Sequence, residues 1–151
     1  MNTNQINLGP RLRIAQLISV GFISFVGALM LVGGSFDFDG VAAASQNQLP
    51  IWPLIIAGIL AAGLSLKVHD LIFRAQLKRI SGSSASSDAI FPIYFITLIV
   101  GSALREAVAV AGLILTMQTG ERGWVMLFGA AATLLILKAW PKASDLQPAS
   151  S

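Results

Sequence analysis

Four apolar stretches separated by short polar segments dominate the pattern of the chain. The first covers residues 14–34 and the third covers residues 89–117. A helix rises about 1.5 Å per residue, so about 20 apolar residues match the hydrocarbon thickness of a bilayer. The second stretch, 51–66, and the fourth, 124–140, are shorter but carry tryptophan at their ends, which is typical of the membrane interface. The pattern predicts an all-α polytopic membrane protein with four transmembrane helices in one domain, residues 1–151.

The second stretch has a helical pattern that continues beyond its apolar part, to about residue 80. Charged residues recur three and four apart on one side of this continuation, which predicts an amphipathic extension at the bilayer surface. A serine-rich segment, 81–87, follows and predicts a flexible linker. The charged residues of the extension are Lys67, Asp70, Arg74 and Lys78.

The composition agrees with a membrane protein. Hydrophobic residues make up 55% of the chain and charged residues only 11%, whereas soluble domains carry about 25% charged residues. So few charges cannot cover a water-soluble globule, which argues against a soluble enzyme, a disordered tail and a nucleic-acid-binding protein. The chain has no cysteine and one histidine, His69, so we expect no disulfide, no metal site and no cofactor.

Basic residues are sorted to one side of the predicted membrane. The opposite side carries only Arg122, with the acidic residues Asp37, Asp39 and Glu121. Since Lys and Arg accumulate in cytoplasmic segments, this distribution predicts that both termini and the middle connection are cytoplasmic, in a multi-pass protein of the cell inner membrane. The eight basic residues on the predicted cytoplasmic side are Arg11, Arg13, Lys67, Arg74, Lys78, Arg79, Lys138 and Lys142.

Two charged residues, Arg105 and Glu106, interrupt the third apolar stretch near its middle. A charge at this depth costs about 2.5–3.5 kcal/mol on insertion scales, so each group needs a polar partner. Neighbouring helix positions point about 100° apart, so the two side chains do not naturally face one another. The pair is the candidate ion- or proton-binding site. The alternative is a structural ion pair, formed within the bundle or with a second copy of the chain.

Small residues surround this pair and recur at a spacing of four. Such stripes let helix backbones approach closely in lipid. They predict that the second and third stretches pack against each other, and they suggest that copies of the chain do so as well. The candidate packing residues are Ala57, Ala61, Gly101, Ala103, Ala107, Ala111 and Gly112.

Residues 101–113, Gly-Ser-Ala-Leu-Arg-Glu-Ala-Val-Ala-Val-Ala-Gly-Leu, resemble the carboxylate-bearing helix of the c subunit, or proteolipid, of rotary ATP synthases. In that family a carboxyl group in the middle of the membrane carries the proton, and the matching position here is Glu106. The resemblance implies a proton or cation carrier.

Over most of its length the chain is similar to a group of bacterial four-span membrane proteins of uncharacterised role. The residues that carry this similarity are Leu12-Arg13-Ile14-Ala15-Gln16 before the first stretch, Ala103 to Ala107 in the third, and Pro141 after the fourth. The similarity implies no particular activity.

The sequence leads to two candidate functions. The first is a non-enzymatic integral membrane protein that self-associates, or that serves as a subunit or assembly factor of a membrane complex. Its partners would be the lipid bilayer, further copies of the chain or other membrane proteins, and not nucleic acid. The second is a carrier like the c subunit that uses Glu106. No nucleophile–base arrangement accompanies the polar residues of the outer segments, so we do not expect an enzyme.

Overall fold

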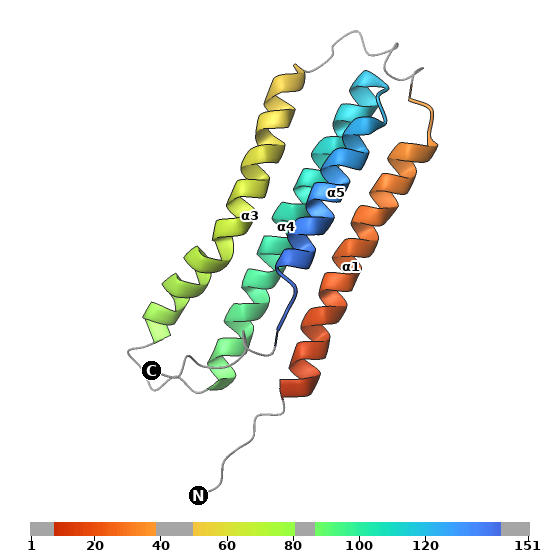
Figure 1. Cartoon of the computed structure of the whole chain (residues 1–151). Coiled ribbons are helices and arrows are strands. Elements are labelled where there is room, and N and C mark those ends of the chain that lie inside the picture. Colours follow the sequence, from red (N-terminus) through yellow and green to blue (C-terminus); the bar gives the residue numbers. More distant parts are fainter. Residues whose placement is uncertain (1–7, 39–49, 81–86, 143–151) are drawn as a thin grey trace, which may run out of the picture.

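The computed structural model describes residues 8–38, 50–80 and 87–142, and these residues form four helices (Figure 1). The described residues contain no strand. The predicted all-α fold with four helices is therefore confirmed. The helices are α1 (Leu8–Ser35), α3 (Ile51–Ile80), α4 (Ser87–Thr119) and α5 (Gly123–Lys138).

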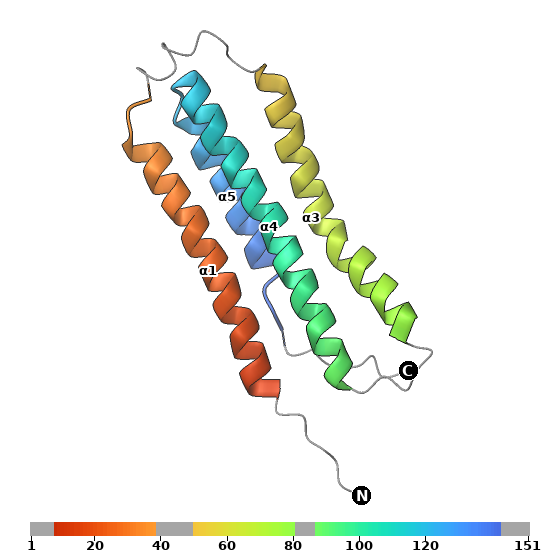
Figure 2. The same cartoon turned by 180° about the vertical axis from the view of Figure 1, so that it is seen from behind.

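The helices form an up-and-down bundle in which α1 and α4 run in one direction and α3 and α5 run in the other (Figures 1 and 2). Helices α4 and α5 each contact all the other helices. Helices α1 and α3 flank them and do not contact each other within the described residues. Since α1 and α3 flank α4 without contacting each other, the outer side of α4 is left uncovered between them.

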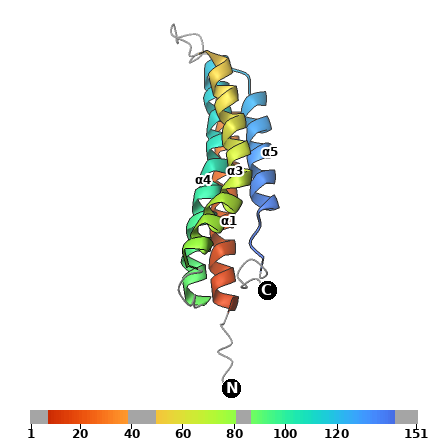
Figure 3. The ribbon, with the colours of Figure 1, turned by 90° about the vertical axis from the view of Figure 1, so that its left-hand side faces the viewer.

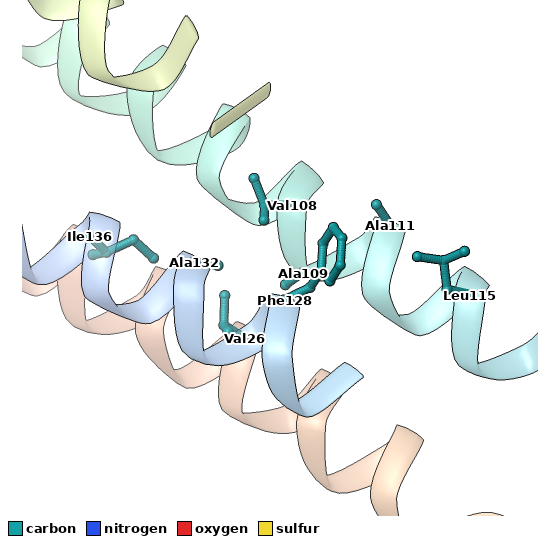
Figure 4. Close-up of a cluster of buried hydrophobic side chains, with 8 residues drawn as sticks. All are labelled: Val26, Val108, Ala109, Ala111, Leu115, Phe128, Ala132 and Ile136. Carbon is teal, nitrogen blue, oxygen red and sulfur yellow. The ribbon is translucent and has the colours of Figure 1, made fainter. Parts of the chain in front are cut away.

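The main core lies where α1, α4 and α5 meet (Figure 4). The close approach of α4 and α5 depends on Gly112, because a Cβ atom at this position would lie 2.5 Å from the Cβ of Phe128. On the other side of α4, the Cβ position of Gly58 in α3 lies 3.6 Å from the Cβ of Ala111. The buried apolar residues of this core are Val26, Val108, Ala109, Ala111, Leu115, Phe128, Ala132 and Ile136.

The outer surface of the bundle is apolar. Large hydrophobic side chains on all four helices are exposed, including Leu31 at 71%, Ile59 at 62% and Leu134 at 67%. Continuous exposed apolar surface of this kind is unfavourable in water and is what a lipid-facing helix presents. Three helices contain segments long and apolar enough to cross a membrane, namely Gly9–Ser35, Ile51–Val68 and Phe91–Thr119. These features support a membrane protein.

Helix α5 differs from the predicted fourth span. It is apolar, but it has only 16 residues and ends at Lys138, whereas the prediction extended to residue 140. Its length of about 24 Å is less than the roughly 30 Å of the hydrocarbon layer. Figure 3 shows that α5 stops well short of the level that the other three helices reach at this end, and residues 139–142 continue without helical structure. The fourth apolar element is therefore a short helix.

The connection between α4 and α5 is a tight turn that contains Gly120 and leads into Gly123, the first residue of α5. Gly120 has a φ of 73°, a conformation that glycine adopts without steric cost. The hydroxyl of Thr116 donates to the carbonyl oxygen of Glu121 at 3.2 Å and accepts from the backbone N–H of Val125 at 3.0 Å. A side chain of α4 therefore satisfies one of the free N–H groups in the first turn of α5.

Helix α3 runs unbroken to Ile80, as its helical pattern predicts. The side chains from residue 73 onward, and those of His69 and Asp70, lie outside the described part, as do residues 81–86 of the predicted linker.

Candidate functional site

Arg105 is buried inside the bundle, with 5% of its surface exposed. One guanidinium nitrogen, Nη2, donates to the backbone carbonyl oxygen of Ser65 in α3 at 3.3 Å. The guanidinium group lies over Gly101, one turn earlier, because helical side chains point back towards the N-terminus. The Nε atom has no hydrogen-bond partner within the described residues. The charged group is therefore only partly satisfied by the protein.

The register of the helices brings two lysines to the level of Arg105. Helices α3 and α4 are antiparallel, and Gly58 lies opposite Ala111. Nine residues later in α3 and nine residues earlier in α4, Lys67 therefore lies at the level of Ser102. The contact of Phe128 with Gly112 places Lys138, at the end of α5, at this same level. Arg105 is one helical turn away. Lys67 and Lys138 therefore lie close to the level of Arg105 and Glu106. The sequence pattern alone does not indicate this, because it does not show how the helices are aligned.

A cavity of about 290 Å³ lies between α3, α4 and the end of α5, and Arg105 forms part of its wall. Three cationic residues line it, and none of the described lining residues is acidic. Lys138 and Lys142 come from the end of α5 and the segment after it, and Tyr94, Thr97 and Leu98 come from α4. The remaining lining residues are Leu66, Gly101, Leu135, Ala139 and Trp140.

Glu106 lies on the outer flank of α4 and is partly exposed. It shares one side of α4 with Leu113, two turns later, whose Cδ1 lies 3.0 Å from the Cβ position of Gly33 in α1. Glu106 therefore borders α1 at the outer surface. In the described part of the chain it makes no hydrogen bond or ion pair. The two adjacent charges do not pair, since Arg105 faces the cavity and Glu106 faces outward.

The small residues near the pair divide into two sets. Gly101, Ala111 and Gly112 are buried between helices, and Ala61 is partly buried against the main core. Ala57 on α3, and Ala103 and Ala107 on α4, are exposed on the outside of the bundle. Helices α3 and α4 do pack together, with Gly58 and Ala111 at their close approach. The exposed alanines lie outside this contact.

Sequence reasoning named Ser65 among the polar residues available to the pair, but did not assign Lys138 or Lys142 to the candidate site. Ser65 contributes a backbone carbonyl, which no side-chain pattern reveals. The lysines were counted only as flanking charges, because the register of α5 on α4 is not visible in the sequence. The sequence feature that could have placed these lysines in the site is the shortness of the fourth apolar stretch, 124–140.

No known protein-family model matches the chain, and no similar curated protein or solved structure was found. The site therefore has to be interpreted from its own geometry. Within the part of the chain that the structure describes, no group of three or more His, Cys, Asp or Glu residues could hold a metal ion.

Proposed function

We propose that the protein is a non-enzymatic, multi-pass integral membrane protein that self-associates through the outer face of α4. This outer face consists of Ala103, Glu106, Ala107 and Val110. The protein thereby serves as a subunit of a membrane complex built from its own copies, or from its copies and another membrane protein.

The observation that carries this proposal is the unpartnered carboxyl of Glu106. A charged group in an apolar, lipid-facing setting requires a polar partner, because hydrocarbon offers none. Glu106 has none within the described residues of its own chain. A partner supplied by a second chain satisfies this requirement, and it also explains why the carboxyl lies on the outside of the bundle.

The surroundings of Glu106 support the same interpretation. Ala103 and Ala107 are exposed beside it, and small residues let two helices in lipid approach closely. If a two-fold axis along the membrane normal joins the outer faces of two α4 helices, the α1 flank of one copy meets the α3 flank of the other. Lys67 is exposed on α3 at nearly the level of Glu106. Among the described side chains of α3, it is therefore the cation that a second copy offers to Glu106.

Cross-linking in native membranes tests this association. The chain contains no cysteine, so a single introduced cysteine is unique. We expect the Ala103→Cys variant to form a disulfide-linked dimer under mild oxidation. The matched control is Ala130→Cys, because Ala130 is exposed on α5, away from the outer face of α4. Equal yields from the two variants, or no dimer from Ala103→Cys, would contradict the proposal.

For the orientation, we infer that both termini and the connection between α3 and α4 are cytoplasmic in the cell inner membrane. The support is the sorting of eight of the ten basic residues to one side of the four helices. A membrane-impermeant maleimide is expected to label a Glu121→Cys variant in whole spheroplasts and a Ser83→Cys variant only after the membrane is opened. The reverse labelling would overturn this orientation.

A second candidate function is that of a proton or cation carrier similar to the c subunit. The observation that favours it is the partly exposed, unpartnered carboxyl of Glu106 on the outer side of a helix, within the segment that resembles that family. Proteoliposomes of the wild-type protein would then show ion flux that Glu106→Gln abolishes. Wild-type flux equal to that of empty liposomes would exclude the carrier.

A further inference from the structure

The cavity beneath α5 lies beside residues 94–105 of α4, within the candidate membrane span Phe91–Thr119. Helix α5 ends at Lys138, and residues 139–142 continue without helical structure. In a membrane, such backbone occurs where protein buries it or where it lines a space filled with water. Pro141 is fully buried, and Ala139, Trp140 and Lys142 line the cavity. The cavity volume of about 290 Å³ is far above the roughly 10–15 Å³ that one water requires.

Arg105 and Lys138 bring positive charge to this cavity, and the described residues that line it include no carboxylate. Glu106, the nearest acidic residue in the sequence, does not pair with Arg105. A buried cation without a counter-charge is costly. The Nε atom of Arg105 is also buried and has no hydrogen-bond partner among the described residues, so the guanidinium has an unused donor at the cavity wall.

We propose that this cavity binds a phosphate group, either as free phosphate or as the head group of an anionic phospholipid. A guanidinium offers several N–H donors in a planar fork that matches the oxygens of a phosphate. Lys138 adds a second cation from the end of α5. The apolar side chains of Leu66, Leu98 and Leu135 in the same wall can accommodate the hydrocarbon next to a lipid head group. The cavity is separate from the outer face of α4, so this proposal does not depend on self-association.

Binding to the delipidated full-length protein in a non-ionic detergent tests the proposal in two arms. One arm titrates inorganic phosphate by calorimetry. The other uses native mass spectrometry to compare phosphatidylglycerol with phosphatidylcholine, whose head group is zwitterionic. Binding of phosphate alone identifies a free anion. Preferential retention of phosphatidylglycerol alone identifies a lipid. Either result supports a phosphate site, and binding in neither arm overturns it.

Matched variants assign the binding to the cavity. Arg105→Gln is expected to weaken binding about tenfold or more, because it removes a charged hydrogen bond from a buried site. Lys138→Gln is expected to weaken it about threefold or more, since an exposed charge contributes less. The control Arg122→Gln removes the same charge from the α4–α5 turn and is expected to change the affinity less than about twofold.

The Lys138→Gln variant keeps the test decisive if Arg105→Gln does not fold, because Lys138 is exposed. Wild-type affinity in Lys138→Gln and in any folded Arg105→Gln, or an equal loss in Arg122→Gln, would show that the bound anion lies elsewhere.

Discussion

Arg105 and Glu106 are adjacent in the sequence, yet they meet different surroundings on α4. Arg105 points inward, where it bonds the carbonyl of Ser65 and borders the cavity. Glu106 lies about 100° further around the helix, on the outer flank. The pair therefore divides into an inner cationic group and an outer acidic group. At the scale of single residues, the two charges are available for two different partners.

The inner position of Arg105 leads to a prediction about stability. We expect the Arg105→Met variant to unfold within about 1 kcal/mol of the wild type, or to be more stable, because an apolar side chain that matches the aliphatic part of arginine replaces a buried charge that is only partly satisfied. The carbonyl of Ser65 stays inside the continuous helix α3, so no polar group is left exposed to the core. Reversible unfolding in mixed detergent micelles measures this difference.

A loss of more than about 3 kcal/mol in Arg105→Met would contradict this account, because that is the cost of breaking a buried polar interaction on which the fold depends. The result separates a structural role of Arg105 from the binding role that the cavity supports.

At the scale of whole helices, α5 determines the shape of the candidate site. Its first turn is held by the hydroxyl of Thr116 in α4, and its contact with Gly112 fixes its register. Since α5 has only 16 residues, this register also fixes where it ends. The contacts of Thr116 and Gly112 lie in the first half of α5. They therefore determine where the cavity and Lys138 lie at the other end of this helix.

The cap that Thr116 provides can be tested directly. Thr116→Val removes a hydroxyl that accepts from Val125 and donates to Glu121. We expect it to cost about 1–3 kcal/mol, because a buried N–H loses its partner. The control is Thr133→Val on α5, where the hydroxyl only donates back to Gly129 in the preceding turn and the change should be near neutral. Unfolding of both variants in detergent measures the difference, and equal stabilities would contradict the capping role.

The contact of α4 with α5 gives a second prediction at this scale. A methyl group in Gly112→Ala would lie 2.5 Å from the Cβ of Phe128 and 2.9 Å from the backbone oxygen of Trp124. The two helices must then move apart, at a cost of about 1–3 kcal/mol. Gly63→Ala on α3 is the control, because nothing lies within 4 Å of its Cβ position. Melting temperatures in detergent compare the two, and a Gly112→Ala protein as stable as Gly63→Ala would show that this packing is wrong.

The elements of the fold were largely predictable from the sequence, whereas their register was not. The apolar stretches mark the four helices, and the Gly120–Gly123 segment marks the turn, because both signals are local. The depth of a residue along its own helix is also visible, which is how Arg105 and Glu106 were singled out. The levels of Lys67 and Lys138 depend on which small residues meet across helices, and these contacts are set by tertiary packing.

The direction of a side chain was predictable only in part. The angular separation of Arg105 and Glu106 follows from helix geometry. Which of the two faces inward depends on where α3 and α5 lie around α4, and one sequence does not contain this information. The candidate packing residues illustrate the same point, since Ala111 is buried while Ala103 and Ala107, on the same stripe, are exposed.

At the scale of the whole molecule, the bundle combines an apolar outer surface with a group of charges at the level of the cavity. Arg105 and Lys138 line the cavity, whereas Glu106 is partly exposed and Lys67 is exposed. The inner set is cationic and suits an anion. The outer set has an acidic group on the α1 flank and a basic group on α3, which suits a second copy of the chain. The outer charges therefore support self-association through the outer face of α4.

Self-association can be tested by the mass of the detergent-solubilised protein, measured by light scattering during size-exclusion chromatography. The wild type is expected to have a protein mass of at least two 15.9 kDa chains. Glu106→Gln should shift the mass towards a single chain, because it removes the charge that binds the second copy. Glu121→Gln, an equivalent change in the exposed α4–α5 turn, should match the wild type. A wild-type mass of one chain, or the same mass for all three proteins, would contradict the account.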